Sequence, residues 1–240
     1  EDYNQGYTSG NTSPSAGEIG STLDAGELNV NGQDLDTTTY GNAEKGEGAS
    51  SAFAIAQAIN DNDELDVEAN PQTNVVTADN PASAGSPGGE GDATQVTGTT
   101  TNGSGAQYTL AINGTTIVDG QDVSGTSLTA EDAAAKINNQ SGDTNVTANV
   151  NDAGELRLSA EDGRSIKVQE IGSISAGQSS AAINGFFGNV SLSAGGAATV
   201  GATNEFRGEV SLSADKSISV TDNNNGASGG GGSEIDTFAG

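Results

Sequence analysis

The sequence contains neither cysteine nor histidine in its 240 residues. The absence of cysteine excludes disulfides, zinc–thiolate sites and thiol catalysis. The absence of histidine removes the side chain that titrates nearest neutral pH, and with it the Ser-His-Asp triad, the histidine-zinc hydrolases and most proton shuttles. We therefore expect a protein that is not an enzyme and that has no catalytic, cofactor-binding or metal-binding residues.

Basic residues and long apolar runs are also scarce. Lys and Arg number 7 against 33 Asp and Glu, and the resulting net charge of −26 disfavours nucleic acid and anionic membranes as partners. No stretch approaches the roughly 20 apolar residues that span a bilayer. The chain opens on Glu1 with no initiator methionine and no basic-then-apolar leader, so we expect a segment excised from a longer polypeptide.

Hydrophobic residues make up only 32% of the chain and aromatic residues 4%, yet two windows show the alternation of half-buried strands. Residues 28–35 and residues 110–117 alternate apolar and polar side chains around a central Asn-Gly pair. Because both turn positions of such a two-residue hairpin need positive φ, Asn-Gly is the strongest short hairpin signal. This geometry predicts three facing pairs: Leu28 with Leu35, Val30 with Gln33, and Leu110 with Ile117.

A short alanine-rich helix is predicted after each hairpin, over residues 50–60 and 129–138, because apolar side chains recur at the i, i+3, i+4, i+7 spacing. Thr129 and Asp132 predict a capping interaction at the start of the second helix. Both helices end at Ile-Asn, which indicates an internal repeat. The expected buried faces are Ala52, Ile55, Ala56 and Ile59 in the first helix, and Ala130, Ala133, Ala134 and Ile137 in the second.

The two copies diverge after the helix. Strands are predicted at residues 74–78 in the first copy and 145–150 in the second, where a hairpin over residues 155–168 closes the copy. In the first copy residues 79–89 instead have the composition of a linker. A matching closing segment lies far downstream at residues 209–220, which predicts that the second domain is inserted into the first.

The sequence therefore predicts an α+β protein, predominantly antiparallel β with short alanine-rich helices, in two small domains. We expect a discontinuous base domain over residues 1–92 and 200–240 and an inserted tip domain over residues 93–199. Residues 186–193 look like a third copy of the closing strand and are assigned to neither domain. Because large side chains are few, each core is expected to be small. The expected aromatic anchors are Phe53, Tyr108, Phe187 and Phe206.

Together, the Asn-Gly hairpin, the helix ending in Ile-Asn, the Val-Thr-Ala strand and the Leu-x-Leu-Ser-Ala segment resemble the flagellin hook IN motif. This motif is repeated in the variable, surface-exposed outer domains of bacterial flagellins and some hook-associated proteins. The resemblance runs from about Gly26 to Val220, and the second copy carries every element between Tyr108 and Val168. The first copy departs from the motif in its interrupted end and at Asp61–Asp66. Residues 206–212 resemble the strand by which flagellin chains leave the outer region.

The resemblance implies a secreted, extracellular structural protein of the bacterial flagellum, in which the hypervariable domains coat the filament and set its surface properties in motility. Its partners would be other flagellin subunits in a helical filament, with outer-domain contacts between neighbours. The helical ends that build a flagellin tube are missing, because no long heptad pattern occurs. An outer domain of a hook-associated or filament-cap protein stays open as an alternative, since the flanking helices decide between the two.

A calcium- or glycan-binding adhesin module is a third alternative. Its candidate calcium segments are Asp61–Asp66, Gly88–Asp92 and Asp222–Gly226. Leu65 stands where an EF-hand needs a ligand, and ordinary turn chemistry explains the asparagines and glycines, so we expect none of these segments to bind metal. The Glu131–Asp132 pair is expected to stabilise the start of a helix rather than to carry out acid–base chemistry.

Two surface properties stay open. The acidity is typical of salt adaptation, which keeps a surface hydrated in brine, and it would also repel neighbouring subunits and cells. Of these two explanations we favour a saline, halophilic habitat. The Thr99–Thr101 run is a candidate for bacterial O-glycosylation.

Overall fold

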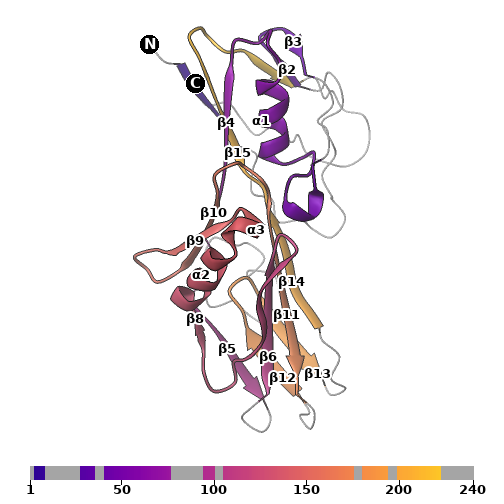
Figure 1. The fold of residues 1–240 in the computed structure, drawn as a ribbon, viewed down its shortest axis with the longest axis vertical. Coiled ribbons are helices and arrows are strands. Elements are labelled where there is room, and N and C mark those ends of the chain that lie inside the picture. The colour runs from indigo at the N-terminus through magenta and orange to yellow at the C-terminus, as the bar shows by residue number, and fades with distance from the viewer. Residues whose placement is uncertain are drawn as a thin grey trace. The chain divides into compact units, whose positions relative to one another are not determined.

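Antiparallel strands and a few short helices make up the computed structural model, which describes residues 3–8, 28–35, 41–76, 94–100, 105–175, 180–193 and 199–222 (Figure 1). The β-rich α+β class predicted from the sequence is confirmed. Contacts divide the chain into two compact units. Unit 1 comprises Glu1–Thr73, Ala160–Ser165 and Phe206–Gly240, and unit 2 comprises Asn74–Ser159 and Ile166–Glu205. The insertion of one domain into the other, with the boundaries given above, stays a prediction.

The described part of unit 1 combines strands that are far apart in the sequence. Its elements are β1 (Tyr3–Thr8), β2 (Leu28–Val30), β3 (Gln33–Asp34), the 3₁₀ turn η1 (Ala43–Lys45), α1 (Ala52–Asn60), most of β4 (Glu68–Val76), β15 (Glu209–Ala214) and β16 (Val220–Asp222). In one sheet β15 lies between β1 and β4, with Leu212 opposite Ala69. In the other sheet β2 lies between β16 and β3, with Val30 opposite Val220. The downstream segment therefore pairs with strands of the first copy.

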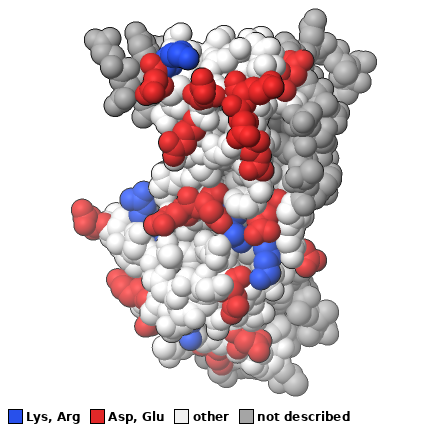
Figure 2. Space-filling model, turned by 45° about the horizontal axis from the view of Figure 1, so that its top comes forward, with Lys and Arg blue, Asp and Glu red and all other residues white. Residues whose placement is uncertain are grey.

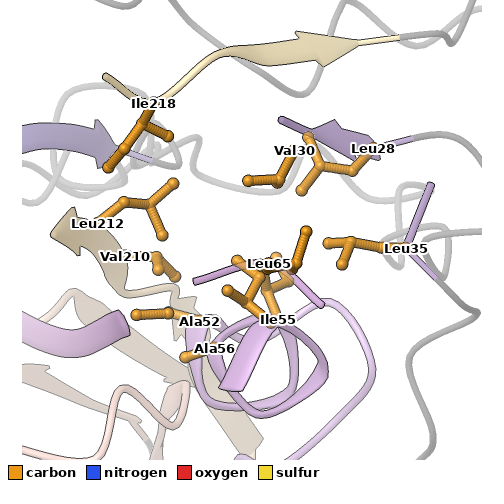
Figure 3. Packing of buried hydrophobic residues seen from close by; sticks show 12 residues of the cluster. Leu28, Val30, Leu35, Ala52, Ile55, Ala56, Leu65, Val210, Leu212 and Ile218 are labelled. Carbon is orange, nitrogen blue, oxygen red and sulfur yellow. The ribbon is translucent and has the colours of Figure 1, made fainter. Parts of the chain in front are cut away.

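The apolar face of α1 packs in the core of unit 1. The helix begins at Ser51, whose hydroxyl accepts a hydrogen bond from the Ala54 N–H at 3.2 Å. Its four predicted face residues, Ala52, Ile55, Ala56 and Ile59, are all buried, as expected. Figure 3 shows this face with side chains from the first hairpin and from the downstream segment in one cluster, which includes Leu28, Val30, Leu35, Leu65, Val210, Leu212 and Ile218. Val210 and Leu212 of β15 thus supply part of the core against which α1 packs.

Unit 2 contains most of the remaining strands and the second alanine-rich helix. Its elements are β5 (Gln95–Thr100), β6 (Ala106–Ile112), β7 (Thr115–Asp122), β8 (Leu128–Thr129), α2 (Ala130–Asn139), α3 (Ser141–Thr144), β9 (Thr147–Val150), β10 (Leu156–Ala160), β11 (Ile166–Ile174), β12 (Ser180–Asn184), β13 (Asn189–Ser193) and β14 (Thr199–Phe206). One sheet has the order β14-β11-β6-β7 and another the order β13-β12-β5-β8, while β9 pairs with β10. The third closing-strand copy, which was unassigned, contributes β13 and lies in unit 2.

The second helix, α2, has the predicted cap and face. The Thr129 hydroxyl accepts a hydrogen bond from the Asp132 N–H at 3.2 Å. Its four predicted face residues are buried: Ala130, Ala133, Ala134 and Ile137. Glu131 and Asp132 lie exposed in the first turn, where acidic side chains suit the positive end of the helix dipole. Local spacing was therefore sufficient to predict both helices.

Two strand predictions were wrong at their boundaries. The strand expected at residues 145–150 starts only at Thr147, because the helical turn α3 ends on Asn145 in the left-handed region at φ 52°. The strand expected at residues 74–78 is β4, which starts earlier, at Glu68, because its first residues pair with β15. Residues 77–78 lie outside the described part of the chain.

The first Asn-Gly hairpin forms as predicted. Asn31 and Gly32 have φ of 53° and 86°, which is the positive-φ pair that this turn requires. Val30 lies opposite Gln33, and the Leu35 N–H donates to the Leu28 carbonyl at 2.8 Å. The facing pairs expected in this hairpin are confirmed.

The second hairpin has the predicted turn but a different register. Asn113 and Gly114 have φ of 48° and 75°, yet a register shift in the pairing of β6 with β7 places Leu110 opposite Val118 rather than Ile117. The prediction for Leu110 was therefore wrong by one residue. The irregularity turns Val118 into the core and leaves Ile117 half-buried, since one extra residue reverses the side-chain alternation.

The predicted closing hairpin over residues 155–168 was also wrong. β10 pairs with β9 and β11 pairs with β6, so the two strands belong to different sheets and residues 160–165 form a corner between them. β15 and β16 likewise enter two different sheets in unit 1. Sequence alternation alone did not distinguish a hairpin from a corner, because both consist of two half-buried strands around a polar turn.

Three of the four expected aromatic anchors are buried in the structure: Tyr108, Phe187 and Phe206. Phe53 is only half-buried, because it lies on α1 between residues that face the core. Phe186, which was not among the expected anchors, is buried beside Phe187 in the turn before β13. Most of the aromatic side chains whose burial the structure describes do lie in the small cores, as expected.

Candidate functional site

The asparagine at the end of each alanine-rich helix ties that helix to the strand that follows it. The Asn60 side-chain amide donates to the Ala69 carbonyl and accepts from the Ala69 N–H, both at 2.8 Å. Asn138 makes the same two hydrogen bonds with Ala148, again both at 2.8 Å. The asparagine side chain thus makes with one strand residue the two hydrogen bonds that a neighbouring strand would make. This explains the asparagine that follows Ile in both copies.

A second asparagine in each copy ties the hairpin turn to the closing strand. The Asn31 side-chain oxygen accepts from the Ser219 N–H at 2.8 Å, and the Asn31 N–H donates to the Ser219 carbonyl at 2.7 Å. Asn113 makes the same pair of bonds with Lys167, at 2.8 and 2.9 Å. Ser219 lies just before β16. It therefore makes in unit 1 the hydrogen bonds to the turn asparagine that Lys167 of β11 makes in the second copy.

The strand pairings of the two copies agree residue by residue. Leu212 lies opposite Ala69, the residue held by the first helix-ending asparagine. Leu158 lies opposite Ala148, which is held by the second. We call the helix-end hydrogen bonds, Asn60 with Ala69 and Asn138 with Ala148, the asparagine clamps. The clamps position the strand that follows each helix, β4 or β9, against that helix.

Replacing Asn138 by alanine is expected to lower the free energy of unfolding of unit 2 by about 2 kcal/mol, because it leaves the N–H and carbonyl of Ala148 without this partner in a part-buried place. Denaturant unfolding followed by hydrogen exchange of α2 and β9 measures the change. The matched control is Asn139→Ala, at the next residue of the same helix, which is exposed and should change stability by about 0.5 kcal/mol or less. Equal effects of the two substitutions would contradict the clamp.

A buried ion-pair cluster in unit 1 surrounds Arg164. Its guanidinium contacts the Asp162 carboxylate at 2.6 Å and the Glu47 carboxylate at 3.1 Å, and it also donates to the Lys45 carbonyl at 3.1 Å. The Arg164 carbonyl accepts from the Thr73 hydroxyl at 2.8 Å. These contacts hold the corner residues 160–165 in unit 1. Sequence reasoning missed this cluster, because Arg164 lies in a polar turn that carries no burial signal.

A buried carboxyl lies in the core of unit 2. Glu170 accepts a hydrogen bond from the Tyr108 hydroxyl at 2.6 Å and one from the Phe187 N–H at 3.2 Å. Burial raises the pKa of Glu170 to about 7, and these hydrogen bonds oppose that shift without cancelling it. Burial, with the nearby Glu170 carboxylate, raises the pKa of Tyr108 well above its usual value. The alternation of residues 166–174 carried a signal for Glu170, since Ile166, Val168 and Ile174 share its face.

The segments considered for metal binding or catalysis do not converge on a site in the part of the chain described. Within it, no group of three or more acidic residues is placed to hold a metal ion. Leu65, in the Asp61–Asp66 segment, is a buried core residue. Residues 88–92 and 223–226 lie outside the described ranges, as does Thr101, whereas Thr99 and Thr100 end β5. Among the described helices none is long and apolar enough to cross a membrane.

Comparison with known proteins identifies the second copy of the repeat. Residues 109–162 match the family model described as the flagellin hook IN motif. This range contains the Asn113 turn, the Asn138 clamp and the Leu158 strand. No curated protein sequence matches the chain. Flagellins are structural, non-enzymatic proteins of the filament, and residues 109–162 of this chain carry a flagellin hook IN motif that supports a flagellin-related structural role.

Proposed function

We propose that this chain forms the surface-exposed outer domains of a flagellin, which coat an extracellular bacterial flagellar filament and set its surface properties. The observation that carries the proposal is the repetition of the asparagine clamp and the turn-to-strand tie in both copies with nearly the same distances. The matched motif covers most of the second copy, up to residue 162, and the first copy reproduces the hydrogen bonds of the second. Two copies of one module are what stacked outer domains would need.

We further propose a nested arrangement, with a discontinuous base domain over residues 1–92 and 200–240 and an inserted tip domain over residues 93–199. The pairing of β15 with β4 and of β16 with β2 supports it, because a downstream segment then closes the first copy. The function of such nesting would be to project the second copy away from the filament axis.

The acidic surface suits a coat that meets solvent and other subunits. Figure 2 shows that Asp and Glu side chains greatly outnumber Lys and Arg on the face drawn. The ion pairs of the described residues include the highly exposed Lys216–Asp66 contact at 3.7 Å. An exposed pair of this kind contributes little to stability. We propose that this surface is adapted to a saline habitat. Circular dichroism that showed equal stability at low and at molar salt would contradict the salt adaptation.

The experiment that tests the function is labelling of flagella from the source cells with an antibody raised against residues 1–240. A flagellin outer domain predicts label along the whole filament in electron micrographs. Label confined to the hook–filament junction or to the filament tip would instead assign the chain to a hook-associated or cap protein. Label on the cell body without flagella would exclude both and leave an adhesin module.

A further inference from the structure

Glu170 lies at an inward-facing position of β11. The other inward-facing positions of this strand carry apolar residues. Alternate residues of β11 face the core, and Glu170 shares this face with Val168 and Gly172. On the adjacent strand β6, Leu110 lies opposite Glu170 and Tyr108 lies opposite Gly172. The carboxyl is fully buried, with 0% of the residue exposed. A charged group at this place has lost its contact with water.

The turn between β12 and β13 is shaped around this carboxyl. The Phe187 N–H donates to Oε2 at 3.2 Å, and the backbone of Phe186 and Gly188 also opposes the rise in the pKa of the carboxyl. Gly185 closes the turn by donating its N–H to the Gly188 carbonyl at 2.9 Å. A Cβ at Gly185 would lie 2.5 Å from Oε1 of Glu170, so the backbone approaches as closely as a glycine allows. We call residues 185–188, between β12 and β13, the carboxyl turn.

No positive charge balances a Glu170 carboxylate among the described residues packed around it. β6 contributes Tyr108 as its one titratable group, and neither β12 nor β13 has a charged residue. β14 contributes Glu205, which pairs with Lys167 of β11 at 3.7 Å. Lys167 is an odd-numbered, half-exposed position of β11 and so lies on the face opposite Glu170. Among the described residues, N–H and O–H dipoles are thus what stabilises a negative charge on Glu170.

We propose that the Glu170 carboxyl is a proton-operated latch for the carboxyl turn: the turn is held closed over β6 and β11 while Glu170 is protonated, and it opens more often when Glu170 loses its proton. In the closed state the Tyr108 hydroxyl proton points at Glu170 Oε1, and a neutral carboxyl carries a further proton of its own. Loss of that proton leaves a buried charge, and opening of the turn admits the water that the charge requires.

The direction of the pH dependence follows from the pKa values of the two states. In the closed state burial raises the pKa of Glu170 to about 7, whereas an opened, hydrated carboxyl has its ordinary value of 4.5. The closed state therefore binds the proton more tightly. Its stability is fully present below the ordinary pKa and decreases as pH rises from there to about 7, above which no further change is expected. Low pH closes the turn and neutral or higher pH loosens it.

The test is hydrogen–deuterium exchange of the full chain, with rates corrected for intrinsic exchange, at about pH 5 and about pH 8. We expect the protection of residues 185–193 to fall by roughly tenfold to a hundredfold at the higher pH in the unmodified chain. Glu170→Gln should abolish this difference. Glu131→Gln, which replaces an exposed glutamate of α2, should leave it unchanged. Tyr108→Phe removes one hydrogen bond to the charged form and should move the midpoint to higher pH.

Direct titration of the Glu170 side-chain carbon by NMR in the unmodified chain keeps the proposal testable if a variant does not fold. A midpoint near 7, at the upper end of the pH range over which protection falls, supports the latch. A midpoint near 4.5, or an unchanged pH dependence in a folded Glu170→Gln variant, overturns it. A Tyr108→Phe midpoint equal to that of the unmodified chain would show that the phenol has no part in the latch as proposed.

Discussion

Substitution of Arg164 by alanine is expected to lower the free energy of unfolding of unit 1 by about 3 kcal/mol. The side chain of Arg164 is only 6% exposed, whereas those of Glu47 and Asp162 are 25% and 30% exposed. Removal of the guanidinium takes from both carboxylates the contact that Arg164 makes with them. Their partial contact with water places the effect at the lower end of the range for broken buried ion pairs. Denaturant unfolding monitored by hydrogen exchange of α1 and β15 measures it.

The corner that Arg164 anchors explains why the loss should reach α1. The Phe53 N–H at the start of α1 donates to the Gly163 carbonyl at 3.0 Å, and the Ser165 N–H donates to the Gly46 carbonyl at 2.7 Å. When Arg164 is removed, both bonds lose the group that holds residues 160–165 in place. Faster exchange at Phe53 and Ser165 is therefore expected before the rest of unit 1 is affected.

Arg157→Ala is the matched control, because Arg157 is an exposed arginine on β10. It should change stability by about 0.5 kcal/mol or less. Combining Arg164→Ala with Glu47→Gln should recover part of the loss, since the second change removes one of the two negative charges that Arg164 contacts. If Arg164→Ala and Arg157→Ala had equal effects, the buried ion pair would not contribute as described.

Substitution of Leu212 or Leu158 by alanine is expected to destabilise a different unit in each case, by about 2–5 kcal/mol. Both side chains are almost fully buried, and each lies opposite the alanine that an asparagine clamp holds. Leu212 belongs to the core cluster of unit 1 with Ile55 and Leu65. The cavity left by the lost methyl groups should therefore open beside α1 in one variant and in unit 2 in the other.

Peptide-resolved hydrogen exchange in increasing urea separates these two effects. Leu212→Ala should increase exchange in α1 and β4, although it lies more than 130 residues downstream of them in the sequence. Leu158→Ala should increase exchange in α2 and β9. The neighbouring Ser211→Ala is the control for the first variant, since Ser211 is only half-buried. If Leu212→Ala loosened α2 rather than α1, the downstream segment would not complete the first copy.

Within each copy the sequence was sufficient to predict the local elements. The positive φ of Asn31 and Asn113, the capping threonine of α2 and the buried faces of both helices all followed from residue spacing. Each of these features depends on a few neighbouring residues, so the chain within about ten residues of the feature determines it. The same local patterns carried the resemblance to the flagellin hook IN motif. The family-model match at residues 109–162 agrees with that resemblance.

The predictions of which strands pair, and in which register, were wrong in the second copy. The alternation around Ile117 was correct in type but not in register, and the segment over residues 155–168 proved to be a corner rather than a hairpin. The helix-ending asparagines were seen as a repeated pair of letters, but their hydrogen bonds to Ala69 and Ala148 were not predicted. Such contacts depend on which strand lies next to the helix, and no local pattern contains that information.

By itself the sequence determined the two alanine-rich helices, the two Asn-Gly turns, the repeated module and the exclusion of thiol and histidine chemistry, because these follow from residue type and short-range spacing. Only the tertiary structure decided that Arg164 and Glu170 are buried. A polar turn and a strand position are ordinarily compatible with exposure, and burial of their charges depends on partners brought from Glu47 and from Tyr108 and Phe187. The energy of a buried charge is set by those distant groups, which explains why the strand alternation could indicate an inward Glu170 but not the partners of either residue.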